Sequence, residues 1–179
     1  DHIYLKKMVL TLLKCDFLPQ DWYKVIKSVT HYTYVDKNVI APFYDKRNER
    51  YFSNIKQFRE FRKYHPNDFY ENMSSFGIPQ GTAISGILAN TYMIEVDQKI
   101  NELVSQHGGM YRRYSDDTII VIPKEKIDKS EWNDLEKCID EIIESAKVSE
   151  QKEKTNTFIY QDHQLYYMDM TEKVYGILD

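Results

Sequence analysis

Apolar residues recur every three to four positions in several segments of the chain, which predicts amphipathic helices there. Pro19 and Asp21 favour the start of one helix, and Pro66 closes another. Gly108-Gly109 ends the longest helix, and Ser130 is expected to cap the last one. The predicted helices cover residues 2–15, the stretch from Pro19 to about Val29, residues 55–64, residues 83–106 and the stretch after Ser130.

Runs of β-branched and aromatic residues predict short strands. Residues 110–114 and 119–122, the latter stopped by Pro123, predict a hairpin with Asp116 and Asp117 at its tip. Residues 32–35 are expected to leave the preceding helix, and residues 36–52 to be irregular or to form short strands. Further strands are expected at residues 157–161, 165–170 and 173–178, with Asp162-His163 as the turn between the first two.

These elements predict a mixed α/β (α+β) fold. A small antiparallel sheet carries Asp116 and Asp117 and packs on the helices that begin near Ala83 and Ser130. A chain of 179 residues is long enough for one domain and short for two. Hydrophobic residues make up 42% and charged residues 29%, which is typical of a globular rather than a disordered protein.

Membrane and disulfide chemistry are not indicated. No apolar run approaches the roughly 18 residues that a spanning helix needs. Cys15 and Cys138 have no metal-ligand spacing and form no disulfide framework, which indicates a reducing compartment. We therefore expect a cytoplasmic protein that does not bind membranes.

Although the net charge is −4, basic residues are concentrated in one region of the chain. Residues 37–65 hold eight Lys and Arg against Asp45, Glu49 and Glu60. Arg59, Arg62 and Lys63 are spaced to share one helix face. Two interpretations remain open for this face: an ordinary solvated surface, or contact with a nucleic-acid phosphate backbone, which such side chains make without recognising sequence.

A glycine-bearing loop precedes the longest predicted helix. Gly77, Pro79 and Gly81 indicate a tight loop, and small residues fill the first two turns of the helix that follows. A loop of this kind at a helix N-terminus favours anions and close approach of a ligand. The alternative is an ordinary loop-to-helix junction followed by a helix-packing seam.

Two adjacent carboxylates, Asp116 and Asp117, follow Tyr114 and Ser115 at the predicted hairpin tip. Ser-Asp-Asp alone could be turn chemistry. The combination of features, however, resembles the palm domain of reverse transcriptases: a Gly-Ile-Pro-Gln-Gly loop at residues 77–81, then Tyr-x-Asp-Asp at 114–117, then Lys154-Thr155 before strands. The similarity is to bacterial enzymes of retrons, group II introns, and abortive-infection or defence systems. It covers nearly the whole chain, so residues 1–179 are expected to be the palm region of a longer protein, without the fingers and thumb.

The resemblance implies an RNA-directed DNA polymerase that acts on an RNA template, a DNA primer and dNTPs. Nucleotidyl transfer of this kind uses two divalent ions about 3.5–4 Å apart, Mg²⁺ or alternatively Mn²⁺. Asp116 matches a metal ligand, and Asp117 matches either a second ligand or a structural position. Lys154 matches a lysine near the triphosphate, although a solvated loop lysine is an equal alternative.

The resemblance also assigns contacts to primer and template. Tyr114 and Ser115 match positions near the primer end, and Tyr175-Gly176 loosely matches the turn that grips the primer. The residues that match the loop lining the nascent base pair are Gln80, Gly81 and Thr82.

Two departures from the family pattern keep other functions open. The family's remaining catalytic aspartate precedes an Asp-His pair that Asp1-His2 resembles, so it is expected upstream and the fragment alone is expected to be inactive. The prolines usual after Pro-Gln-Gly are missing, and a long insert lies between Tyr32 and Phe76, both more similar to the defence-associated group. The alternatives are template-independent DNA synthesis in antiphage defence, a degenerate palm that only binds nucleic acid, and, less favoured because Ser115 is not glycine, an RNA-dependent RNA polymerase.

Overall fold

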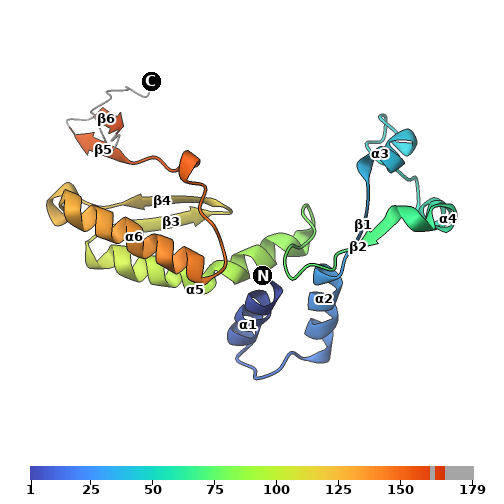
Figure 1. Cartoon of the computed structure of the whole chain (residues 1–179), viewed down its shortest axis with the longest axis horizontal. Coiled ribbons are helices and arrows are strands. Elements are labelled where there is room, and N and C mark those ends of the chain that lie inside the picture. The colour runs from blue at the N-terminus through green and yellow to red at the C-terminus, as the bar shows by residue number, and fades with distance from the viewer. Residues whose placement is uncertain (162–163, 168–179) are drawn as a thin grey trace.

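The longest helix, α5 (Ala83–Gln106), runs through the body of the protein, and other helices and a β-hairpin pack along it (Figure 1). The computed structural model describes residues 1–161 and 164–167. At about 1.5 Å per residue, the 24 residues of α5 span about 36 Å. Helices α1 (His2–Leu13) and α2 (Gln20–Thr30) pack near its N-terminal half, and α6 (Lys129–Ser145) lies along its C-terminal half.

Two clusters of buried side chains form the core, and α5 contributes to both. Leu88 of α5 is buried against α1 and α2, in a cluster with Leu5, Val9, Ile26 and Val29. The second cluster surrounds the other half of α5 and is made of Val96, Ile100, Val104, Tyr111 and Ala146. Because one rigid helix belongs to both clusters, it fixes how the two ends of the domain sit relative to each other.

The described strands form antiparallel pairs rather than one continuous sheet. β3 (Met110–Tyr114) pairs with β4 (Asp117–Val121) and packs on α5, which confirms the predicted hairpin. β5 (Phe158–Gln161) pairs with β6 (Gln164–Tyr167). The predicted turn Asp162-His163 and the predicted strand at residues 173–178 lie outside the described residues, together with Tyr175 and Gly176.

An arm projects from the body between α2 and α5 (Figure 1). Its stem is the pair β1 (Thr33–Val35) and β2 (Phe69–Glu71), so residues 33–35 leave the helix as predicted. Between the strands lie α3 (Lys37–Ile40), η1 (Ala41–Phe43), α4 (Ile55–Tyr64) and η2 (Pro66–Asp68). Residues 36–52, expected to be irregular or to form short strands, instead include a short helical segment, and an isolated β-bridge joins Asp45 and Arg50.

The helix ends explain where the predicted boundaries were right and wrong. α5 ends in a Schellman motif, in which Gly108 N–H donates to Ser105 O (2.9 Å) and Gly109 N–H donates to Val104 O (3.1 Å). The predicted cap at Ser130 is wrong. Asp128 caps α6 instead, because its carboxylate accepts from Glu131 N while the Glu131 side chain accepts from Asp128 N, a reciprocal capping box. α1 ends at Leu13 rather than residue 15, since Lys14 turns left-handed with φ of 53°.

Two short 3-10 helices, η3 (Lys124–Lys126) and η4 (Lys152–Lys154), flank α6 in the sequence. Within the described residues, none of the helices has the length and apolar character required to cross a membrane.

Candidate active site

The two carboxylates lie at the tight end of the β3–β4 hairpin. Tyr114 pairs with Asp117, so Ser115 and Asp116 form a two-residue turn. Ser115 has a φ of 58°, the left-handed conformation that two-residue hairpin turns require and that glycine adopts most easily. Asp116 and Asp117 are both exposed, and neither carboxylate has a hydrogen-bond or ion-pair partner in the described part of the chain. Their oxygens are therefore free to bind a ligand.

The two faces of the hairpin have different surroundings. Tyr111 and its cross-strand partner Ile120 pack in the core against α5. Because side chains alternate along a strand, Asp117 shares the opposite face with Ile119, which is exposed. Tyr114, 85% exposed, lies on that outer face beside the turn. The turn thus presents its carboxylates next to a surface that the described residues leave uncovered.

Arg113 connects the hairpin to α5 at the level of the turn. Its Nε donates to Asp97 Oδ1 and its Nη2 to Asp97 Oδ2, both at 2.7 Å, a bidentate ion pair. Its Nη1 donates to Ser115 O at 2.6 Å and to Asn90 Oδ1 at 3.2 Å. One guanidinium group therefore links two turns of α5 to the backbone between Tyr114 and Asp116.

Tyr111 completes this network from the buried side. Its hydroxyl donates to Asp97 Oδ1 at 2.8 Å. Burial, and then the hydrogen bond to Asp97, raise the pKa of Tyr111, which keeps its hydroxyl a donor. The hydrogen bond to Asp97 raises the pKa of Arg113. Sequence analysis missed Asn90, Asp97, Tyr111 and Arg113, although strand alternation places Tyr111 and Arg113 on the same face, and an inward-facing arginine needs an acidic partner.

The glycine-bearing loop is fixed at the N-terminus of α5. Ser85 Oγ donates to Pro79 O and shares a hydrogen bond with Thr82 Oγ1, while Gly81 adopts a φ of 78°. His2 Nε2 lies 2.6 Å from Gly77 O, so α1 also holds the loop. In the first turn of α5, a Cβ added to Gly86 would have nothing within 4 Å, so no described residue packs closely on the helix at this glycine. The side of the helix with small residues stays open to an approaching molecule.

The contact between Arg113 and Asn90 places the hairpin turn near this loop. Asn90 is seven residues after Ala83, or about 10 Å along the helix axis. Gln80, Gly81 and Thr82 therefore lie at the same end of α5 as Asp116 and Asp117. The structure brings together the two sequence motifs that carry the resemblance.

The other predicted site residues lie elsewhere. Arg59, Arg62 and Lys63 are exposed on α4 in the arm, remote from the hairpin in Figure 1, and the Arg62 guanidinium lies 5.4 Å from the centre of the Phe69 ring. Lys154 is exposed at the end of η4, where its N–H donates to Gln151 O at 2.8 Å.

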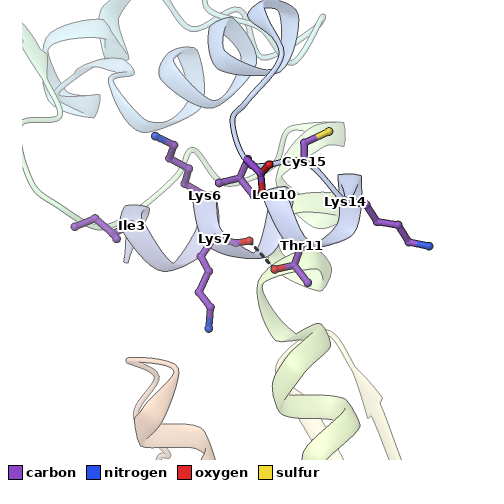
Figure 2. Close-up of a pocket in the computed structure, with 8 residues that line it drawn as sticks. Ile3, Lys6, Lys7, Leu10, Thr11, Lys14 and Cys15 are labelled. Atoms are coloured by element: carbon purple, nitrogen blue, oxygen red, sulfur yellow. Dashed lines mark hydrogen bonds between the residues drawn. The ribbon is translucent and has the colours of Figure 1, made fainter.

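A shallow pocket on α1 includes none of the predicted site residues (Figure 2). Apolar Ile3 and Leu10 lie in it between lysine side chains, and Thr11 Oγ1 donates to Lys7 O at 3.0 Å. The candidate site is therefore the open surface around the hairpin turn rather than a closed cavity.

Comparison with known families shows which family the chain belongs to. Residues 21–171 match the reverse transcriptase (RNA-dependent DNA polymerase) family. The chain belongs to this family. A comparison with curated proteins finds no match. The match covers the loop, α5, the hairpin and α6, so the mixed helices and small antiparallel sheets of this reverse transcriptase domain form a palm-type fold.

Members of the family use divalent metal ions, and the donor chemistry at the turn fits such ions. Mg²⁺ prefers hard oxygen ligands and retains several waters, so one or two carboxylates hold it together with substrate phosphates. Asp116 and Asp117 supply such oxygens. Among the described residues, no group of three or more acidic, histidine or cysteine side chains gathers to hold a metal. The turn therefore offers two oxygen donors of the kind that such a ligand set needs, and no more of them gather there in the described part of the chain.

Proposed function

We propose that this chain is the palm of an RNA-directed DNA polymerase, with Asp116 and Asp117 as its metal-binding carboxylates. The observation that carries the proposal is the pair of exposed carboxylates, without partners among the described residues, on a turn anchored to α5 at the helix end that also holds Gln80–Thr82. A binding-only protein has no need for two free carboxylates beside a phosphate backbone, because they repel it. Residues 1–179 are the palm region of a longer chain in this proposal.

The residues of the chain would orient the substrates around the turn. When bound, the divalent ions activate the primer 3′ hydroxyl and stabilise charge on the leaving pyrophosphate. Tyr114, exposed beside the turn, would pack against the primer end together with Ser115. Gln80, Gly81 and Thr82 would line the nascent base pair from the N-terminus of α5, where backbone N–H groups favour anions.

More distant residues take supporting roles in this proposal. Lys154 would neutralise the triphosphate, and Tyr175-Gly176 would grip the primer. On the arm, Arg59, Arg62 and Lys63 are exposed and form no ion pair within the described residues, so they are available for backbone phosphates.

Two other functions remain candidates. The arm built from residues 33–71, and the absence of prolines after Gly81, favour a defence-associated enzyme that extends DNA without a template. The incomplete ligand set among the described residues favours a degenerate palm that only binds nucleic acid.

Primer extension by the full-length protein tests all three functions. The wild type, Asp116→Asn and the control Asp134→Asn would receive Mg²⁺, dNTPs and either a primed RNA template or no template. Asp134 is an exposed carboxylate of α6, so Asp134→Asn makes the same change in charge as Asp116→Asn but leaves the turn intact. We expect RNA-templated extension by the wild type and Asp134→Asn, and none by Asp116→Asn.

Each other outcome selects a different function. Product without a template that disappears in Asp116→Asn would establish template-independent synthesis. Nucleic-acid binding with no incorporation in Mg²⁺ or Mn²⁺ would refute the polymerase proposal and establish the degenerate palm. The 179-residue chain alone is expected to give no product.

A further inference from the structure

The guanidinium group of Arg113 is almost fully used by fixed partners. Its hydrogen bonds to Asp97, Asn90 and Ser115 O occupy four of the five N–H donors of an arginine. The Arg113 side chain is 9% exposed and that of Asp97 is 29% exposed, so this ion pair is partly protected from water and salt. Bidentate pairing fixes the orientation of both groups as well as their separation.

The same arginine constrains the turn that carries the carboxylates. Ser115 holds a left-handed backbone conformation that serine adopts at a cost, with φ of 58°. Such a conformation persists where the surroundings over-determine it. The carbonyl that Arg113 binds belongs to Ser115 and forms the peptide bond to Asp116. Rotation of that peptide would move the Asp116 carboxylate and break the hydrogen bond to Arg113.

We propose that Arg113 and Asp97 are positioning residues for divalent metal binding at Asp116 and Asp117. They hold the Ser115 carbonyl against α5, and so keep the turn in the conformation in which its carboxylates bind the ion. The inference rests on the proposed function of that turn. Removing a residue that orients a metal ligand without touching the metal typically lowers metal affinity about 10–100-fold.

Asp97 has a second effect, which is electrostatic. It neutralises the positive charge that Arg113 brings next to the turn. Without Asp97, that charge would repel a divalent cation. Arg113→Lys keeps the positive charge but cannot form the bidentate pair with Asp97. Asp97→Asn instead leaves the positive charge of Arg113 without a neutralising carboxylate. The two variants separate geometry from charge.

The chain offers a matched control in Arg112. It is the same residue type on the same strand, but it is exposed on the opposite face. Within residues 1–161 and 164–167, its side chain donates only to the carbonyl of neighbouring Tyr111, from Nη1 at 2.8 Å. Arg112→Lys therefore repeats the chemical change without touching α5 or Ser115 O. Any effect of adding lysine to β3 itself would be common to both variants.

The experiment measures Mn²⁺ binding to the full-length protein by electron paramagnetic resonance, and primer extension against Mn²⁺ concentration. We expect Arg113→Lys to raise the half-saturating Mn²⁺ concentration about 10–100-fold in both assays, while Arg112→Lys leaves it unchanged. Saturating Mn²⁺ should restore most of the kcat of Arg113→Lys, and the KM for primer–template should not change. A purely structural role would lower kcat and thermal stability without this selective metal dependence.

The outcomes separate this inference from the proposed function. Folded Arg113→Lys that binds Mn²⁺ like Arg112→Lys would overturn the positioning role, even if the wild type polymerises. Wild type that binds Mn²⁺ at Asp116 but incorporates no nucleotide would refute the proposed function, and the shift in Arg113→Lys would still be measurable. If Arg113→Lys does not fold, Asp97→Asn decides: it removes the carboxylate that pairs with Arg113 and keeps a side chain of the same size, and an unchanged Mn²⁺ affinity would overturn the inference.

Discussion

Gly109 joins α5 to β3, and replacing it by alanine tests how closely the hairpin must pack on the helix. A Cβ built at Gly109 would lie 2.7 Å from Val121 O, 2.7 Å from Ile122 Cγ1 and 2.8 Å from Val104 Cγ1. Two of these neighbours cannot easily move. Val121 O is backbone of the strand that leads away from the turn, and Val104 is a fully buried β-branched residue with a stiff side chain.

The expected cost follows from forcing one extra methyl group into a close-packed contact. Such overpacking typically destabilises a protein by about 1–3 kcal/mol. Gly86→Ala is the matched control, because it makes the same chemical change in α5 where a Cβ meets nothing within 4 Å. Alanine is favoured over glycine in an exposed helix by about 1 kcal/mol, so Gly86→Ala should stabilise the protein.

Urea unfolding followed by circular dichroism would compare wild type, Gly109→Ala and Gly86→Ala. At roughly 1–3 kcal/mol per molar urea, a loss of about 2 kcal/mol lowers the midpoint by roughly 1 M. We expect the two alanine variants to move in opposite directions. Equal midpoints for Gly109→Ala and wild type would refute the close packing of α5 on the hairpin. An equal gain in both variants would indicate that the lower backbone entropy of alanine in the unfolded chain, and not a clash, determines the result.

Two further substitutions test local features of the same structure. Ser115→Gly should stabilise the protein by about 1 kcal/mol in urea unfolding, because glycine adopts the left-handed φ of 58° without the steric cost that serine bears. Ser115→Ala keeps that cost and should not stabilise the protein. A gain in both variants would contradict the argument that Ser115 is strained. Asp128→Ala should lower the free energy of unfolding by about 1 kcal/mol, because it removes the capping box with Glu131, whereas Ser130→Ala should have little effect. Thermal midpoints in the reverse order would show that Ser130 is the cap.

Local patterns sufficed to predict the helices and the hairpin because each depends on residues near in sequence. The Gly108-Gly109 pair closes α5 through hydrogen bonds to Ser105 and Val104, all within six residues. The cap of α6 was misassigned for a related reason. Ser130 and Asp128 are both suitable capping residues, and only the partner Glu131 at the third helical position distinguishes them.

The network around Arg113 could not be predicted from local pattern because its members are distant in the sequence. Asp97 is 16 residues from Arg113, and Asn90 is 23 residues away. Their meeting depends on the Schellman turn, which directs β3 back along α5. Period-two alternation shows that Arg113 faces inward, but not which acid on α5 it meets.

Helix α5 positions both the proposed substrate contacts and the two carboxylates. The loop Gln80–Thr82 begins α5, while Asn90 and Asp97, two turns apart on that helix, hold the guanidinium that fixes the turn. An α-helix hardly changes length, so the spacing between the loop and Asp116 is set by the number of helical residues between Ala83 and Asn90. Replacing a loop residue would leave the carboxylates in place. An insertion in that stretch of α5 would change the distance between the loop and the turn, and would also rotate the loop relative to the helix face that meets Arg113. The palm therefore places its proposed nucleotide and metal contacts by helix geometry rather than by contacts between the loop and the turn.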